Sequence, residues 1–288
     1  MDSASLILGR AAAFLKTSEA WTTVLPVSRG ARAAALQNIE VVRLEGRAAR
    51  GAAAAMAAVV CITSIIDRTH RQLTTLTLCW HPALTTAALE RLGDCAALTK
   101  LNLEHCTSIA ALPERLGDCA ALKSLVLTYC SGITALPERL GDCAALMELN
   151  LSYCRGLTAL PERLGDCAAL TTLILKGCSG LTALPERLSD CAALTTLILK
   201  GRSGLTALPE RLGDCAVQFL DLDGCISVVR YHAVASRLEY RGCAVYAENG
   251  KDSDSNEDYS DDIDSDGNEI YYYSGSDYDY EGRAASLS

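Results

Sequence analysis

The stretch "LTALPERLGDCAALTTLILKGCSG" at residues 157–180 is followed at once by a near copy, "LTALPERLSDCAALTTLILKGRSG", at residues 181–204. The two copies differ only by Gly165 against Ser189 and by Cys178 against Arg202. The same period extends to both sides, since five prolines stand 24 residues apart: Pro113, Pro137, Pro161, Pro185 and Pro209. Self-similarity at a fixed period predicts a stack of equivalent structural units.

Each unit predicts one short strand and one tight turn. The copy that begins at Leu122 reads L-x-x-L-x-L-x-x-C-x-x-L-x-x-L-P. Its alternation Leu125-Val126-Leu127 is typical of a strand with one buried face. The segment "LPERLGDC" predicts a short helical or 3₁₀ stretch with proline in its first turn. A unit of this size cannot bury its leucines alone, so we expect the strands of neighbouring copies to pair in parallel, about 4.8 Å apart.

This pattern resembles the leucine-rich repeat, whose period is roughly 20–29 residues. The resemblance covers about residues 73–226, and a degenerate further copy stands at 36–44. The wording "LPERLG" and "LKGCSGLT" is most similar to the intracellular repeats of plant disease-resistance and related algal and protist proteins. The resemblance implies an α/β leucine-rich-repeat solenoid, a horseshoe, with a parallel concave sheet that binds a partner protein. The copies start at Leu73, Leu98, Leu122, Leu146, Leu170, Leu194 and Val217.

Composition divides the chain into three regions. Residues 1–70 are expected to form a helical N-terminal region or cap, and residues 71–247 the repeats with a C-terminal cap of one helix and a final strand. The formal net charge is -9, but residues 248–288 hold 13 acidic residues against Lys251 and Arg283. This low-complexity tail is expected to be disordered. The body is close to neutral and carries no basic patch, which argues against a nucleic-acid partner.

The 14 cysteines follow the repeat. Cysteines that recur every 24 residues occupy one structural position per copy, and buried free thiols behave as small hydrophobic groups. Free thiols and the absence of a convincing signal peptide favour the cytoplasm, with the nucleus as a further possibility. No C-x-x-C pair indicates a metal site. The apolar run at 51–66 has 16 residues, fewer than the roughly 20 that span a membrane, so we expect a buried helix and no membrane partner.

The exposed strand positions define a candidate partner-binding surface. Its N-terminal half carries a strip of aromatic rings, which are enriched in binding hot spots. Stacking of these rings as a mere consequence of duplication is the alternative. The C-terminal half carries two lysines beside Ile174 and Ile198. The candidate binding residues are Trp80, Asn102, Glu104, His105, Tyr129, Asn150, Tyr153, Lys176 and Lys200.

Catalysis has little support in the sequence. His105 beside Cys106 comes nearest to a nucleophile pair, but Cys106 fills a repeat position. There is no P-loop and no dinucleotide fingerprint, and we expect no cofactor. On the opposite face the recurrent Glu-Arg dipeptides, such as Glu138-Arg139, are expected to form ladders that pair crosswise between copies and face solvent.

The sequence therefore predicts a non-enzymatic protein-interaction scaffold. The alternative is a substrate adaptor of a ubiquitin ligase, because "TVLPVSRGAR" within residues 5–35 loosely resembles the end of an F-box motif. The usual leading "LP-x-E" element of that motif is missing. In the adaptor hypothesis, the N-terminal region binds the ligase and the sheet holds the substrate.

Overall fold

The computed structural model describes residues 41–45, 63, 66–67, 69, 71–201, 204–225 and 231–247, together with two short strands at 262–263 and 269–270. The F-box-like segment at 5–35 and most of the apolar run at 51–66 lie outside these residues. The chain divides into two units, Met1–Asn249 and Gly250–Ser288.

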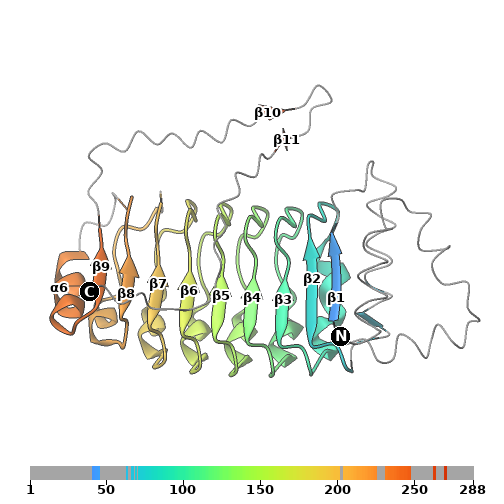
Figure 1. Cartoon of the computed structure of the whole chain (residues 1–288), viewed down its shortest axis with the longest axis horizontal. Coiled ribbons are helices and arrows are strands. Elements are labelled where there is room, and N and C mark those ends of the chain that lie inside the picture. Colours follow the sequence, from blue (N-terminus) through green and yellow to red (C-terminus); the bar gives the residue numbers. More distant parts are fainter. Residues whose placement is uncertain are drawn as a thin grey trace, which may run out of the picture. The chain divides into compact units, whose positions relative to one another are not determined.

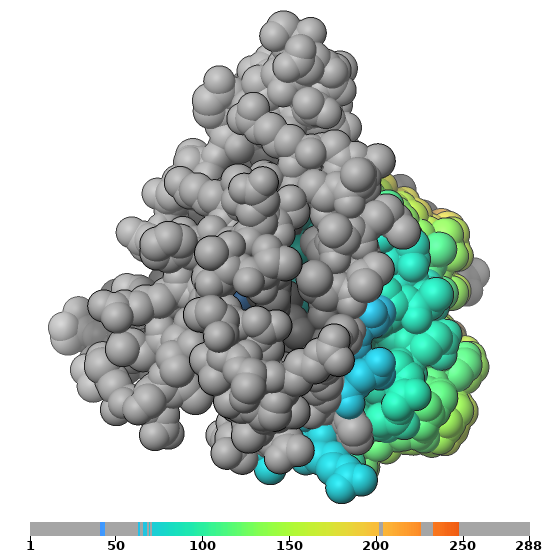
Figure 2. Space-filling model, turned by 90° about the vertical axis from the view of Figure 1, so that its right-hand side faces the viewer, coloured from blue at the N-terminus to red at the C-terminus, as the bar shows by residue number. Residues whose placement is uncertain are grey.

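The first unit is built on a parallel sheet of nine strands, which follow one another in chain order within the described residues (Figure 1). Each coil of the repeat contributes one strand, as the sequence predicts. Figure 2 views the row from its N-terminal side, where the first coils (cyan) are followed by later ones (green to yellow). The strands are β1 Val41–Glu45, β2 Thr75–Cys79, β3 Lys100–Asn102, β4 Ser124–Val126, β5 Glu148–Asn150, β6 Thr172–Ile174, β7 Thr196–Ile198, β8 Phe219–Asp221 and β9 Ala244–Tyr246.

Leucine fixes the register of the sheet. Leu101 pairs with Leu125 and Leu125 with Leu149, and the series continues in the same way along the repeats. In each three-residue strand from β4 to β8 the central leucine is buried and its two neighbours are half-exposed on the other face. The predicted alternation of buried and exposed residues is thus confirmed. It leaves one face of the sheet lined by the variable residues of each copy.

A five-residue 3₁₀ turn follows each strand on the opposite side of the coil. Proline lies immediately before this turn, as its N-cap, rather than within it, and its carbonyl accepts the first hydrogen bond, as from Leu140 to Pro137 (3.1 Å). The first coil has Leu89 in place of proline, and there the short helix α5 Thr86–Leu89 runs into the turn. The turns are η2 Glu90–Asp94, η3 Glu114–Asp118, η4 Glu138–Asp142, η5 Glu162–Asp166, η6 Glu186–Asp190 and η7 Glu210–Asp214.

The repeated cysteines bind the coils together. In one series the thiol of Cys130 donates to the carbonyl of Leu103 in the preceding coil (3.0 Å), and in the other Cys119 donates to Leu92 (3.0 Å). Both thiols are free and fully buried. Burial raises the pKa of each thiol to about 12. The cysteines therefore have the structural role that their spacing predicts.

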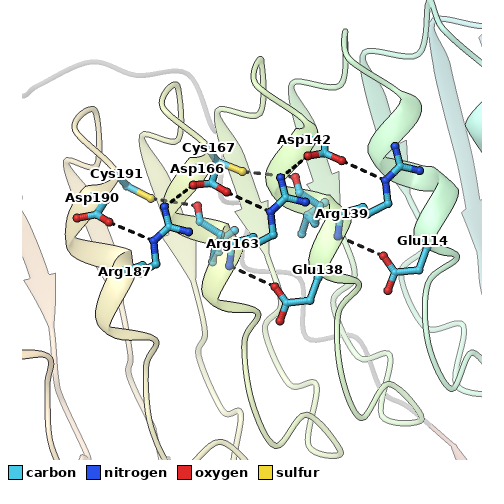
Figure 3. Close-up of polar contacts among 12 residues, drawn as sticks. Glu114, Glu138, Arg139, Asp142, Arg163, Asp166, Cys167, Arg187, Asp190 and Cys191 are labelled. Carbon is cyan, nitrogen blue, oxygen red and sulfur yellow. Dashed lines mark hydrogen bonds and ion pairs between the residues drawn. The ribbon is translucent and has the colours of Figure 1, made fainter.

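The charged ladder on the turns differs from the expected one. Arginine pairs with aspartate and not with glutamate: Arg163 reaches Asp142 of the preceding coil (2.5 Å) and Asp166 of its own turn (3.2 Å) (Figure 3). Glu138 instead accepts a hydrogen bond from the backbone N–H of Arg163 (3.3 Å). The reason is geometric, because the 3₁₀ turn brings the residue three positions onward beside the arginine, whereas the adjacent glutamate points to the next coil.

Ser189 interrupts this regular packing. At the equivalent positions glycine is required, since a Cβ at Gly165 would lie 2.2 Å from the backbone oxygen of Arg187. Ser189 carries a Cβ, and at its coil the ladder loosens: Arg211 lies 3.3 Å from Asp190 and is 72% exposed. The corresponding Arg187 lies 2.5 Å from Asp166 and is 46% exposed. One of the two differences between the near-identical copies thus opens the contact between η6 and η7.

Both ends of the sheet are closed by irregular coils. The degenerate copy expected at 36–44 is confirmed as strand β1, so the sheet begins inside the N-terminal region that we expected to be helical; the described residues Thr63, Ile66, Asp67 and Thr69 are helical. At the other end helix α6 Tyr231–Tyr240 leads into β9, as expected. In the second unit the strands β10 Asp262–Ile263 and β11 Glu269–Ile270 pair antiparallel, and the rest of the expected disordered tail lies outside the described residues.

Candidate partner-binding surface

Four aromatic residues stand at one position of successive coils, four residues after the central leucine of each strand or its equivalent. We call Trp80, His105, Tyr129 and Tyr153 the aromatic strip. The backbone N–H of Tyr129 donates to the carbonyl of Ser152 in the next coil (2.9 Å), and the other three make the same kind of bond. The strip therefore rides on the hydrogen-bond ladder that extends the sheet, and its spacing is set by the coils.

The rings of the aromatic strip are stacked face to face. Their centroids are 3.5 Å apart from Trp80 to His105, 4.4 Å from His105 to Tyr129 and 4.5 Å from Tyr129 to Tyr153, and no two neighbours are tilted by more than 11°. Each of the four residues is half-buried. Stacking covers the ring faces, so the strip presents ring edges and the polar groups that they carry.

The strip has a conformational cost. All four residues adopt a left-handed backbone, with φ between 57° and 62°. The next three coils place glycine at the same position, Gly177, Gly201 and Gly224, also with positive φ. A left-handed conformation costs a residue with a Cβ roughly 1–2 kcal/mol, and glycine almost nothing. The fold thus accepts glycine here, yet four coils keep an aromatic ring.

The two predicted asparagines shape the ends of their strands. Asn150 Oδ1 accepts hydrogen bonds from the backbone N–H of Ser152 (3.0 Å) and from its hydroxyl (2.7 Å). Asn102 accepts the backbone N–H of Glu104 in the same way (2.9 Å). Such a turn competes with strand continuation and bends the chain. Part of the role of these asparagines is therefore local, and it places the following aromatic residue.

The charged residues of the candidate surface lie beside the strip. Glu104 Oε1 is 3.9 Å from His105 Nε2. The ammonium of Lys176 lies over the ring of Tyr153, 5.5 Å from its centroid. Lys200, one coil further, forms an ion pair with Asp223 (3.0 Å). The structure thus brings the nine predicted residues to one side of the sheet, with Lys176 at the end of the strip.

Sequence reasoning missed two aromatic residues on the same side. Phe219 and Tyr246 lie on β8 and β9 with their ring centroids 5.3 Å apart, and Tyr246 is 54% exposed. Phe219 occupies the first outward position of its strand, where earlier coils have Thr172 and Thr196. Alignment of "QFLDL" with "TTLIL" contains that signal, whereas Tyr246 stands in the cap and no repeat position announces it.

Cys106 is not arranged as a nucleophile. Its thiol donates to the carbonyl of Leu78 (3.0 Å) in the core, while the neighbouring His105 ring lies in the stack. Burial raises the pKa of the Cys106 thiol well above its usual range. Within the described residues there is no cluster of three metal-binding side chains. No helix in that part of the chain is both apolar and long enough to cross a membrane.

No protein-family model matches the chain, and no curated protein matches it. Solved structures with a similar fold include the Arabidopsis receptor kinase HAESA in complex with the peptide hormone IDA and the co-receptor SERK1, at 21% identity and a TM-score of 0.45. That match covers 56% of this chain and 27% of the HAESA chain. The leucine-rich-repeat domain of the type III effector XopL matches at 20% identity and a TM-score of 0.45, over 86% of this chain and 96% of that one.

A leucine-rich-repeat protein of Leptospira interrogans matches at 16% identity and a TM-score of 0.34, over 73% of this chain and 60% of its own. At these identities the likeness is one of fold. The 24-residue period, one parallel strand per coil and the recurrent 3₁₀ turns make this chain a leucine-rich-repeat protein.

Proposed function

We propose that the chain is a non-enzymatic scaffold that binds a partner protein on the exposed face of its sheet, with the aromatic strip as the main contact. One observation carries the proposal: four consecutive coils place an aromatic ring at a left-handed position where the next three coils have glycine. Rings at such positions are strained, and backbone strain concentrates at functional sites.

Stacking alone does not explain the choice of residues. A stacked pair contributes about 0.5–1.5 kcal/mol, which is similar to the left-handed cost that each ring incurs. The net gain in stability over glycine is therefore close to zero. What the rings add is a ridge of large, rigid side chains, and such residues are enriched where binding energy is concentrated.

The sheet face beside the strip suits a protein partner. It is mixed in character, with half-exposed Ile174 and Ile198 next to charged side chains such as Lys200 and Asp223. An apolar centre with a charged rim is the usual composition of a protein interface. A cytoplasmic or nuclear location remains part of the proposal and rests on the free thiols.

The ubiquitin-ligase adaptor is the alternative function, and it depends on residues 5–35. It uses the same sheet face for the substrate and differs only in a second contact made by the N-terminal region. Both functions are therefore tested with one set of variants.

The test is affinity capture from cells with three forms of the full chain. The first is unchanged, the second carries Trp80→Gly, His105→Gly, Tyr129→Gly and Tyr153→Gly, and the third carries Thr182→Ala and Thr206→Ala on exposed positions away from the strip. Glycine keeps the backbone conformation that later coils already show. We expect partners that the first and third forms capture and the second does not.

A fourth form without residues 1–40 separates the two functions. Ligase subunits that are captured only when residues 1–40 are present favour the adaptor. Partners that the glycine form retains as well as the unchanged chain contradict the strip as the binding surface.

A further inference from the structure

The aromatic strip stops abruptly at Tyr153, and the coils beyond it carry no side chain at this position. The next three residues there are Gly177, Gly201 and Gly224. One face of the Tyr153 ring stacks on Tyr129, with the centroids 4.5 Å apart. The other face is directed toward the glycine coils and is approached by the Lys176 ammonium.

The geometry leaves room for one more ring. Tyr153 leans over the next coil, because a Cβ on Gly177 would lie 2.6 Å from its Cδ1 atom. A ring that continues the series at the same spacing would therefore lie one coil further, above Gly201. A Cβ built on Gly201 meets nothing nearer than the backbone N of Gly177, at 3.3 Å. Among the described residues, no side-chain atom is a near neighbour of that Cβ position.

Positive charge flanks the same place. Lys176 contacts the Tyr153 ring only near the outer limit of a cation–π interaction, which is about 6 Å. Its long side chain can turn to a neighbouring carboxylate and leave the ring face to a better stacking partner. Lys200 stands one coil further, and its side chain remains 46% exposed beside Asp223. A group that approaches here meets an aromatic face with two ammonium groups at its side.

We propose that this end of the strip binds an aromatic side chain flanked by carboxylates, in a segment of the partner protein. The partner's ring stacks on Tyr153 above Gly201 as a fifth member of the series, and its carboxylates pair with Lys176 and Lys200. The inference deepens the proposed function, on which it rests, by naming the chemistry of the partner.

The test is a nuclear magnetic resonance titration with three end-blocked synthetic peptides: Asp-Asp-Tyr-Asp-Asp, Asp-Asp-Ala-Asp-Asp and Asn-Asn-Tyr-Asn-Asn. We expect the full chain to bind the first at least tenfold more tightly than either of the others. Tyr153→Gly removes the ring, and Gly201→Asn fills the place above the glycine. Each variant is expected to abolish the preference for tyrosine over alanine.

Two further variants separate charge from ring. Lys176→Gln is expected to reduce the preference for the aspartate peptide over the asparagine peptide about threefold and to keep the preference for tyrosine. Lys123→Gln removes an exposed lysine away from the strip and is the matched control. Equal binding of the tyrosine and alanine peptides, or unchanged binding by Tyr153→Gly, overturns the proposal.

The tail of the chain itself contains Asp-Tyr-Asp-Tyr-Glu at residues 277–281. The titration is therefore repeated with the chain ending at Asn249, where the first unit ends. Binding by the shortened chain alone supports the recognised chemistry and makes residues 277–281 a competitor for it. No binding by either form overturns the inference, and strip-dependent capture of a partner in that case leaves the proposed function standing.

Discussion

The balance between stacking and backbone strain at Tyr129 gives a quantitative prediction. We compare Tyr129→Ala with Tyr129→Gly in the full chain. Both variants remove the ring from its stacks with His105 and Tyr153, whose centroids are 4.4 and 4.5 Å away. Only glycine also releases the strain of the left-handed backbone, where Tyr129 has φ 60°.

The magnitudes are set by these two terms. Two stacked pairs at about 0.5–1.5 kcal/mol each make the loss about 1–3 kcal/mol for both variants. Alanine keeps the left-handed cost, whereas glycine recovers about 1–2 kcal/mol of it and gives back part through the greater freedom of its unfolded chain. We therefore expect Tyr129→Gly to be more stable than Tyr129→Ala by about 1 kcal/mol, although it has the smaller side chain.

Urea unfolding followed by circular dichroism measures the difference, with equal m-values as the check that both variants unfold alike. The control is the pair Thr182→Ala and Thr182→Gly, at an exposed position for which no positive φ is observed. There alanine should be at least as stable as glycine. A Tyr129→Ala variant that equals or exceeds Tyr129→Gly in stability would refute the account of the strip as strained.

The packing of the coils gives three further predictions. Ser189→Gly should raise the free energy of unfolding by about 0.5–2 kcal/mol, because it restores the close contact of the other turns; a lower stability in urea would contradict this. Gly141→Ala should cost about 1–3 kcal/mol, since its Cβ would lie 2.2 Å from the backbone oxygen of Arg163, and an unchanged urea midpoint would show that the coils can move apart. Raising the pH should unfold the chain cooperatively. Burial raises the pKa of Cys130 to about 12 from an ordinary 9.0, so the stability is present below pH 9 and is lost as the pH rises toward 12, by about 1.4 kcal/mol per pH unit for each such thiol. Circular dichroism and thiolate absorbance should change together, and thiols that ionise near pH 9 in a folded chain would contradict it.

The repeat made the architecture predictable. Leu125 and its equivalents recur every 24 residues between variable neighbours, and that pattern determines strand, register and buried face together. The aromatic strip could be read as a column for the same reason. Its left-handed backbone could have been inferred too, because Gly177, Gly201 and Gly224 stand in the same column as the rings.

Other features depend on how neighbouring coils meet. The partner of Arg163 was mistaken because residues adjacent in sequence were paired, whereas the 3₁₀ turn brings Asp166 and Asp142 beside the guanidinium. The effect of Ser189 requires the distance from its Cβ position to the next coil. Phe219 and Tyr246 meet only because the cap strand β9 joins the sheet.

Site-specific photo-crosslinking tests the central claim, that a partner binds at the aromatic strip. A photoreactive phenylalanine derivative replaces Tyr153 in one form of the full chain and Thr206, an exposed residue away from the strip, in another. The account predicts that light joins the same partner protein to the chain from position 153 and not from position 206. A partner joined from position 206 alone, or equally from both positions, would contradict it.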